Sequence, residues 1–378
     1  MTTDRCRNVV LGAGAMGSAA AYHLARRGEP VLLVEQFALG HDRGSSHGAA
    51  RITRHSYADP AYARLMPAAF AAWRSLEADA GETLYIRTGG VSISPTDVPY
   101  VDQVASNLAD LGVPHRRMSG AAWNAAHPAF GLRPDDRVVF EPDAGMLKAA
   151  RALRVEVALA CALGPMTEVR DRTPVRRIDL DGERPRLVTD AGIVEADRLI
   201  VTAGAWTGRL VPTLAETLRP TRQVVGYFRP ADPAPYALGT LPVFIYKGEG
   251  DLDAFYGMPG SPGLGTKVAR HGGPDADPDR PEPVATEADF APVRDFLRSR
   301  MPGLADAPID RAEVCLYTVA PGDHFRVATL PGRTDVVVAS PCSGHGFKFS
   351  CLIGSILADL ALDGATPHDI AAWSLPPR

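Results

Sequence analysis

Cys315 lies among residues of the types that surround reactive groups. Its segment, AEVCLYTVAPGDHF, also contains Tyr317 and, beyond a polar turn, His324. A cysteine in this setting has five roles open to it: core packing, a disulfide, a metal ligand, a nucleophile or an attachment point for a cofactor. The chain contains five cysteines, which lie far apart and form no CxxC pair. This spacing argues against a disulfide framework and predicts no metal site.

Two arginines follow a loop rich in Gly, Ser and His. Arg51 and Arg54 lie in QFALGHDRGSSHGAARITRHSY. If the chain becomes helical from Ala49 onward, their spacing brings both guanidinium groups to one side of the helix. Two cations at the edge of a nucleotide site would hold a substrate carboxylate or an electron-rich cofactor ring. The alternative is that both are ordinary solvated arginines.

A second polar cluster precedes a predicted C-terminal helix. The loop SGHGFK contains Gly344, His345, Gly346 and Lys348, and apolar residues then recur at helical spacing until Gly364. Free N–H groups and the dipole at a helix N-terminus favour negative charge. Because a lysine has the wrong sign for that position, this loop predicts an anion nearby.

A glycine turn near the N-terminus predicts the element that positions these groups. The apolar run 8–11 is typical of a strand buried on both faces, and it leads into GAGAMG. In this pattern Gly12 permits the tight turn and Gly14 lets a pyrophosphate approach the backbone. Gly17 lets the following helix pack against the strand. The order of strand, glycines and helix predicts a dinucleotide site.

The elements after the glycine turn extend this unit. Met16 begins a predicted helix over 16–27, and the strand VLLVE then ends at Glu35. An acid at this position binds a ribose 2′-OH and repels a 2′-phosphate, so the pattern disfavours NADP more than it separates FAD from NAD. A later strand in DRLIVTAGAW ends at a glycine, Gly204, which predicts close approach of the backbone to a ligand.

Length and composition limit the class of protein. A chain of 378 residues with 46% apolar and 22% charged residues predicts two domains, or one large domain with an insertion. The net charge of −4 and the scattered basic residues argue against a nucleic-acid partner. Neither a signal peptide nor an apolar run of the ~20 residues of a membrane helix is present, so we expect a soluble cytoplasmic protein.

Five segments together resemble the monomeric sarcosine oxidase family, whose relatives include N-methyltryptophan oxidase and pipecolate oxidase. They are GAGAMGSAAAYHLARRG, GSSHGAARITRHSY, FYGMPGSPGLGTKVARHGG, CLYTVAPGDHF and SGHGFKFS. The likeness extends from about residue 7 to about residue 370. It implies an α/β protein, α+β overall, in which a Rossmann-like FAD-binding domain is interleaved with a β-sheet substrate domain. The FAD-binding domain would combine 1–85, 146–220 and 320–378, and the substrate domain would combine 86–145 and 221–319.

The resemblance also implies an answer for Cys315. In this family the matching cysteine is bonded through sulfur to the 8α-methyl group of FAD. The reaction implied is oxidation of an amine that carries a carboxylate, with O2 as acceptor and hydrogen peroxide as product, in a monomeric enzyme. The family's active-site lysine, which activates oxygen, matches Lys267.

Other positions match the family residue by residue. Arg54 and Lys348 match its clamp on the substrate carboxylate, and Tyr256 matches another substrate-site residue. Arg51, His271 and Tyr317 match residues around the reacting atoms. The FAD-binding set implied is Gly12, Gly14, Met16, Gly17, Glu35, Ser45, His47, Arg51, Cys315, Gly344, His345, Gly346 and Lys348.

Two departures leave the substrate open. The charged, Gly-rich hairpin 244–260 and the cysteine at Cys342 differ from the family pattern, so sarcosine, another N-methyl amino acid, pipecolate or a bulkier amine all remain candidates. Other classes of function are a nicotinamide dehydrogenase, a catalytically idle flavoprotein and a flavin dehydrogenase that does not use O2. A nicotinamide enzyme has no use for Cys315 or the SGHGFK loop, and an idle protein would have lost the charged residues.

Overall fold

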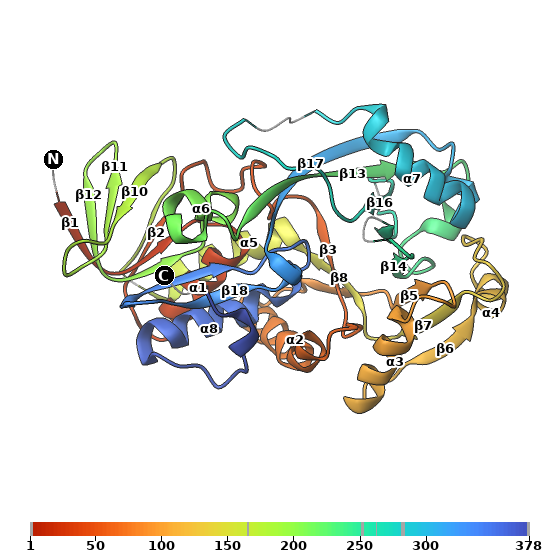
Figure 1. Ribbon diagram of the computed structural model, residues 1–378, viewed down its shortest axis with the longest axis horizontal. Helices are drawn as coiled ribbons and strands as arrows, with labels where there is room; N and C mark the ends of the chain where they lie inside the picture. Colours follow the sequence, from red (N-terminus) through yellow and green to blue (C-terminus); the bar gives the residue numbers. More distant parts are fainter. Residues whose placement is uncertain (1–2, 165, 251–252, 262, 281–283, 376–378) are drawn as a thin grey trace.

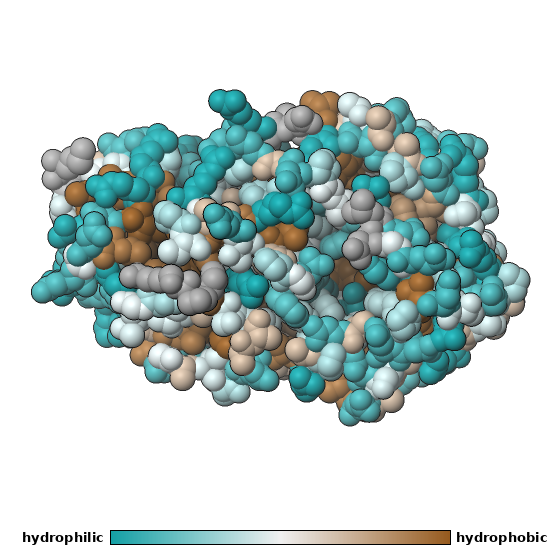
Figure 2. All heavy atoms as spheres, in the orientation of Figure 1, coloured by the Kyte–Doolittle hydropathy of each residue, from teal (hydrophilic) through white to brown (hydrophobic). Residues whose placement is uncertain are grey.

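Two large β-sheets dominate the computed structural model, which describes residues 3–164, 166–250, 253–261, 263–280 and 284–375. Within these ranges each large sheet has eight strands, and a small three-stranded sheet lies between them in an elongated molecule (Figure 1). The face of the molecule in Figure 2 is mainly hydrophilic, with apolar residues visible between the polar ones.

The first sheet contains the nucleotide-binding unit that the sequence predicts. Its strand β1 pairs in parallel with β2 on one side and β12 on the other, and β9 follows β2. β19 runs parallel to the end of β12, while β10 and β11 extend the sheet in antiparallel fashion. The strands are β1 (Thr3–Leu11), β2 (Val31–Val34), β9 (Thr167–Arg170), β10 (Val175–Asp179), β11 (Arg186–Thr189), β12 (Ile193–Val201), β18 (Arg326–Leu330) and β19 (Arg333–Ser340).

Four long helices pack on this sheet and on one another. They are α1 (Ala15–Arg26), α2 (Pro60–Ala80), α5 (Ala149–Leu163) and α8 (Ser350–Asp363), and a short helix α6 (Thr207–Leu210) follows β12. The helices α1 and α8 approach closely because Gly354 faces Ala19: a Cβ on this glycine would lie 2.5 Å from the alanine Cβ. As predicted, α8 ends before Gly364, which adopts φ +74°.

The second sheet has the strand order β17-β13-β16-β15-β14-β5-β7-β6. Its strands are β5 (Gly90–Ser94), β6 (Arg116–Ser119), β7 (Arg137–Glu141), β13 (Arg219–Phe228), β14 (Val243–Lys247), β15 (Ala254–Met258), β16 (Thr266–Arg270) and β17 (Ile309–Val319). The helices α3 (Tyr100–Asp110), α4 (Gly120–Ala126) and α7 (Glu287–Arg300) accompany it. A capping box between Thr286 and Asp289 begins α7.

Side-chain alternation gives this sheet two different faces. Phe244 and Phe255 point into a core with Phe296 of α7, and the ring centroids of Phe255 and Phe296 lie 4.4 Å apart. Their neighbours in sequence point the other way, and Ile245 and Tyr256 line the internal cavity described below. The sheet therefore presents one packed face and one face that is free to carry chemistry.

The chain does not become helical from Ala49 onward, the condition under which Arg51 and Arg54 would share one side of a helix. Residues Ala50–Thr53 form strand β3, which with β4 (Tyr85–Arg87) pairs antiparallel to β8 (Gly145–Lys148) in the small sheet. The β-branched residues at the end of β3 are buried and suit a strand. Because side chains alternate along an extended chain, Arg51 and Arg54 do not share a face as they would on a helix.

The mixed α/β fold is confirmed, whereas the predicted boundaries of the two domains stay a prediction. Among the described residues, no helix is both long enough and apolar enough to cross a bilayer.

Candidate active site

A cavity of about 1170 Å³ extends from the glycine turn after β1 to the free face of the second sheet. It collects residues from distant parts of the sequence, including Arg51 of β3, Arg54 of the loop before α2, and the loop before α8. Every residue that the sequence predicts for the site lines it except Gly17. That glycine packs against the turn instead: a Cβ there would lie 1.7 Å from the Gly12 carbonyl oxygen.

The glycine turn leaves room for a ligand at one end of the cavity. Gly12 adopts φ +101°, and its N–H donates to the Val34 carbonyl at 2.7 Å. A Cβ at Gly12 would lie 2.6 Å from the Thr202 carbonyl oxygen, so another residue would force the turn open. Ser46, which sequence reasoning missed, accepts a hydrogen bond from the Ala15 N–H at 3.0 Å. The loop before β3 is thereby fixed against the start of α1.

Glu35 provides a buried acceptor beside this turn, since only 5% of it is exposed. Its carboxylate accepts hydrogen bonds from the N–H groups of Ala13 at 2.8 Å and Phe37 at 3.0 Å. Burial raises the pKa of Glu35, but His41 and these N–H groups outweigh that effect and hold the pKa below its ordinary value. The side chain is therefore an anion at neutral pH.

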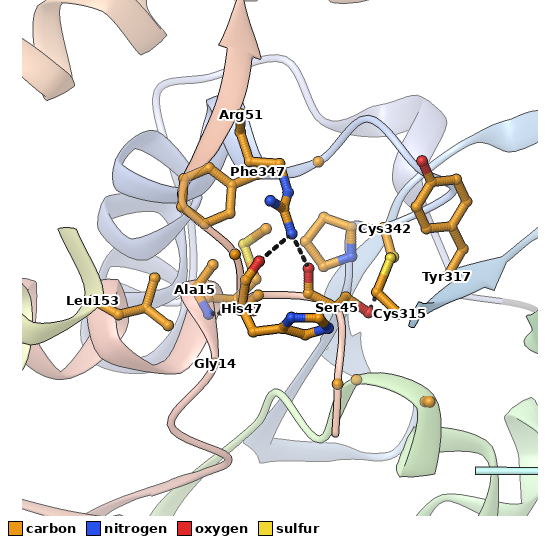
Figure 3. Close-up of a pocket in the computed structure, with 18 of the residues that line it drawn as sticks. Gly14, Ala15, Ser45, His47, Arg51, Leu153, Cys315, Tyr317, Cys342 and Phe347 are labelled. Atoms are coloured by element: carbon orange, nitrogen blue, oxygen red, sulfur yellow. Dashed lines mark hydrogen bonds between the residues drawn. The ribbon is translucent and has the colours of Figure 1, made fainter. Parts of the chain in front are cut away.

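Arg51 is held at the middle of the cavity by backbone carbonyl groups. Its Nη2 atom donates to the carbonyl oxygens of Ser45 at 2.9 Å and His47 at 2.5 Å, and the guanidinium lies over the Phe347 ring (Figure 3). Burial and the charge of Arg51 lower the pKa of His47, whose Nε2 atom is buried without a partner. A neutral imidazole and a fixed cation thus face the same space.

Cys315 lies across the cavity from Arg51, beside Cys342 and Tyr317 (Figure 3). The thiol is free and buried; burial raises its pKa, while the positive charges of Arg51 and Lys267 oppose that rise. Burial keeps this sulfur away from solvent but open to the cavity, which suits either packing or attachment of a cofactor.

The SGHG turn approaches two aromatic rings from the opposite side. Gly344 adopts φ +76°, and a Cβ there would lie 2.3 Å from Tyr317 Cε2 and 2.4 Å from His271 Cε1. His345 follows and places its Nε2 atom 3.0 Å from the Asp323 carbonyl oxygen. Because of the two short distances at Gly344, a residue with a side chain could not replace this glycine without displacing the rings.

Two basic side chains lie around Tyr57: Lys348, which is buried, and Arg54, which is half-buried. Lys348 Nζ donates to the Tyr57 hydroxyl at 2.9 Å and to the His345 carbonyl at 2.7 Å, and the Arg54 guanidinium lies 4.7 Å from the Tyr57 ring centroid. Burial and the Arg54 charge hold the pKa of Lys348 well below its ordinary value. The Nε and Nη1 atoms of Arg54 are buried without a hydrogen-bond partner.

Within the described ranges no carboxylate pairs with either cation, so the site is built to receive an anion. Tyr57 was missed by sequence reasoning. Its only sequence signal is its position three residues after Arg54, which has no local meaning until the strand β3 and the loop before α2 are in place.

Lys267 points from β16 into the cavity and is 4% exposed. Its Nζ atom donates to the Ala50 carbonyl at 3.3 Å. Burial and the charge of Arg51 lower its pKa to about 7, and Glu313 opposes them. Glu313 accepts a hydrogen bond from the Tyr227 hydroxyl at 3.1 Å.

Glu313 was also missed by sequence reasoning. It lies two residues before Cys315 on β17, so the period of two along a strand places both side chains on one face. That alternation was the signal available in the sequence.

His271, Tyr256 and Tyr317 form the wall between the sheet and the SGHG turn. The ring centroids of His271 and Tyr317 are 5.4 Å apart. Burial lowers the pKa of His271 to about 4, with further lowering by Lys247, Lys348 and Arg54. Burial raises the pKa of Tyr256 to about 12. At neutral pH this wall is therefore uncharged.

The residues present fit an FAD molecule. The Gly12 turn leaves the backbone open to phosphate, Glu35 offers a buried anionic acceptor, and the unpartnered Nε2 atom of His47 faces the middle of the cavity. A nicotinamide cofactor would use the first two features but would leave the space around Cys315 unexplained.

Comparison with known proteins agrees with this fit. Residues 7–360 match the family described as FAD dependent oxidoreductase. The chain is 34% identical over 377 residues to monomeric sarcosine oxidase of Bacillus sp. (strain NS-129), covering 97% of this chain and 95% of the relative. It is 30% identical over 370 residues to N-methyl-L-tryptophan oxidase of Yersinia pestis (strain Pestoides F), with coverage of 97% and 98%.

Solved structures agree on the fold. The amino acid oxidase NikD in its open form superposes with a TM-score of 0.86 at 24% identity, covering 98% of both chains. Glycine oxidase from Geobacillus kaustophilus superposes with a TM-score of 0.81 at 17% identity, covering 99% of both chains. The resemblance inferred from the sequence motifs is confirmed, and the chain belongs to the family of FAD-dependent oxidoreductases.

Proposed function

We propose that this protein is a flavin-dependent oxidase of a secondary-amine amino acid, sarcosine or another N-methyl amino acid, with O2 as the electron acceptor. The observation that carries the proposal is the pair of basic residues Arg54 and Lys348, which has no acidic partner within the described ranges and shares a cavity with the FAD site. Because burial disfavours charge on these groups, a substrate carboxylate would compensate Arg54 and favour the charged form of Lys348. The relatives named for sarcosine and N-methyl-L-tryptophan support the same class of substrate.

FAD, when bound, supplies two-electron oxidation of the C–H bond beside the amine nitrogen. Overall, the amine loses two electrons and two protons to become an imine, O2 gains them to become hydrogen peroxide, and water hydrolyses the imine. Arg54 and Lys348 would bind and orient the substrate carboxylate. His271 is uncharged at neutral pH and so would not repel a positively charged amine.

The other cavity residues would divide the remaining tasks. Tyr256 and Tyr317 would shape the pocket, and Lys267 would stabilise the negative charge that develops on O2. The flavin would contact Arg51, Ser45, His47, Gly344, His345 and Gly346. We also propose that the enzyme is a cytoplasmic monomer.

The test is a substrate panel on the purified holoenzyme in an oxygen electrode. Sarcosine, pipecolate and N-methyl-L-tryptophan are compared, with hydrogen peroxide measured against O2 consumed. Anaerobic bleaching of the flavin by a substrate without later O2 consumption would identify a dehydrogenase instead. A cyclic or bulkier amine as the best substrate would select the alternative oxidase. No bleaching by any amine would overturn the proposal.

We expect the flavin to be bonded to the Cys315 sulfur. Forming the bond replaces a thiol S–H and a methyl C–H by S–C, with reduction of O2 to hydrogen peroxide. Acid precipitation of the wild-type protein should leave flavin in the pellet, whereas Cys315→Ala should release it to the supernatant. Cys161→Ala, which changes an exposed cysteine, is the matched control and should keep a coloured pellet. A colourless wild-type pellet would contradict the bond.

Glu313 should set the pH range over which Lys267 stays charged. The pKa of Lys267 lies near 7 with Glu313 present, and removing this negative charge lowers it further. The charged lysine exists below its pKa, so the rate of flavin reoxidation by O2 should decrease as pH rises through that value. In Glu313→Gln the decrease should begin at lower pH. Asp310→Asn, at the exposed end of the same strand, should leave the profile in place, and an unshifted profile in Glu313→Gln would refute this effect.

A further inference from the structure

Lys247 is a cavity residue that the proposed function does not use. It ends strand β14 and is half-buried, and it lines the same cavity as Arg54 and Lys348. Across the described residues it forms no ion pair and no side-chain hydrogen bond. The hairpin 244–260, which the sequence marks as unusual in charge, therefore brings a free cation to the substrate end of the cavity. Residues 251–252 of this hairpin lie outside the described ranges.

The choice of residue type argues against an ordinary solvated cation. The chain contains 40 Lys and Arg residues, of which only four are lysines: Lys148, Lys247, Lys267 and Lys348. All of them except Lys148 line the cavity. Because this protein uses arginine almost everywhere on its surface, a general surface charge at the end of β14 would be expected to be arginine as well.

Strand register directs Lys247 toward the substrate. Lys247 pairs with Ala254 of β15, and the Ala254 carbonyl accepts a hydrogen bond from the His271 N–H at 2.7 Å. Directly paired residues project from the same face of a sheet, so the lysine and the histidine point into the same cavity. They lie two strands apart, about 10 Å, and the small residue Ala254 is on the strand between them.

Lys247, Lys348 and Arg54 all act on the same side chain, His271. The positive charges that lower the pKa of His271 are, in decreasing order of effect, Lys247, Lys348 and Arg54. The hairpin has two described acids, Glu249 and Asp253, and neither pairs with Lys247; the Asp253 carboxylate lies beside Gly248. A substrate with a single carboxylate would neutralise the Arg54–Lys348 pair and would leave Lys247 uncompensated.

We propose that Lys247 binds a second anionic group, so that the preferred substrate is a secondary amine with two carboxylates. This inference rests on the proposed function, because it assigns the first carboxylate to Arg54 and Lys348. The second carboxylate belongs either to the amino-acid side chain, as in N-methylaspartate, or to the other substituent on nitrogen, as in iminodiacetate. Both have the chemistry that a half-buried ammonium group recognises.

The first experiment measures binding without turnover. Thioethers replace the amine nitrogen by sulfur: (methylthio)acetate carries one carboxylate, and thiodiacetate and (methylthio)succinate carry two. Calorimetry on the wild-type holoenzyme should show that at least one diacid binds about tenfold or more tightly than the monoacid, and that the preference decreases with salt. The diacid that binds more tightly than the monoacid shows whether the second carboxylate belongs to the amino-acid side chain or to the other substituent on nitrogen.

Matched variants then assign the effect to one side chain. In Lys247→Met the ratio of diacid to monoacid affinity should decrease about tenfold, and Lys247→Arg should restore part of it. Lys148→Met makes the same substitution at a lysine outside the cavity and should keep the wild-type ratio of diacid to monoacid affinity. Equal binding of monoacid and diacids by the wild type, or an unchanged ratio in Lys247→Met, would overturn the inference.

Turnover distinguishes this inference from the proposed function. We expect kcat/KM for N-methylaspartate or iminodiacetate to exceed that for sarcosine. Oxidation of sarcosine with no gain for either diacid would refute the role of Lys247 and leave the proposed function intact. Tighter binding of diacid thioethers without oxidation of any amine would refute the proposed function and retain the binding role.

Discussion

Lys267→Met should slow the reoxidation of reduced flavin by O2 by roughly 10²-fold or more, the size of effect seen when one fixed donor to a developing oxyanion is removed. The first electron transferred to O2 creates a negative charge. Lys267 is buried, and Arg51 and Glu313 are the charged groups with the largest effects on its pKa. A fixed cation in a dry cavity stabilises that negative charge far better than a lysine exposed to water would.

The two half-reactions should separate in stopped-flow measurements. Oxidation of the amine creates no such anion, so anaerobic reduction of the flavin by substrate should change much less in Lys267→Met. Lys148→Met, which removes a half-buried lysine outside the cavity, should leave both half-reactions unchanged. If reoxidation by O2 is as fast in Lys267→Met as in the wild type, Lys267 is not the oxygen site.

Arg54→Met should remove the preference of the enzyme for substrates that carry a carboxylate. The Nε and Nη1 atoms of its guanidinium are buried and have no hydrogen-bond partner among the described residues, so an anion would supply one. Losing one partner of such a charge-assisted pair costs about 2–5 kcal/mol, equivalent to at least about 30-fold in kcat/KM for sarcosine. Dimethylamine has no carboxylate, so its slow turnover should change little.

The measurement is the ratio of kcat/KM for sarcosine to that for dimethylamine. Arg270→Met is the matched control. Arg270 lies at the end of β16, the strand that carries Lys267, but it does not line the cavity. It should keep the wild-type ratio. Equal turnover of the two amines by the wild-type enzyme would exclude the clamp by Arg54 and Lys348.

Much of the fold was predictable because its signals are local. The positive φ of Gly12 and the contact of Gly17 with the Gly12 carbonyl act within one turn of chain, and the structure has both glycines at these positions. In the same way, helical spacing predicted α8, and Gly364 predicted where this helix ends. Cys315 and Lys267 were identified by motif. Both reach the cavity because side chains alternate in direction along a strand, and these two point to the face that borders the cavity.

Other features depend on contacts between segments far apart in sequence. On a helix the spacing of Arg51 and Arg54 would put them on one side, but Arg51 lies in β3, which pairs with β8, and Arg54 follows that strand. Both nevertheless line the cavity. Tyr57 became a partner of Lys348 only because the loop before α2 meets the loop before α8.

By itself, the sequence determined the nucleotide-binding turn, the acidic residue after β2 and the residue types available for catalysis, since these follow from backbone sterics and short periodicities. The tertiary structure decided which cations share a space and which lack a counter-ion. Lys247 illustrates the reason: its direction depends on its register with Ala254 and His271, and a shift of one residue would turn it to the opposite face. Strand register is set by packing across the whole sheet, so no local pattern in the chain specifies it.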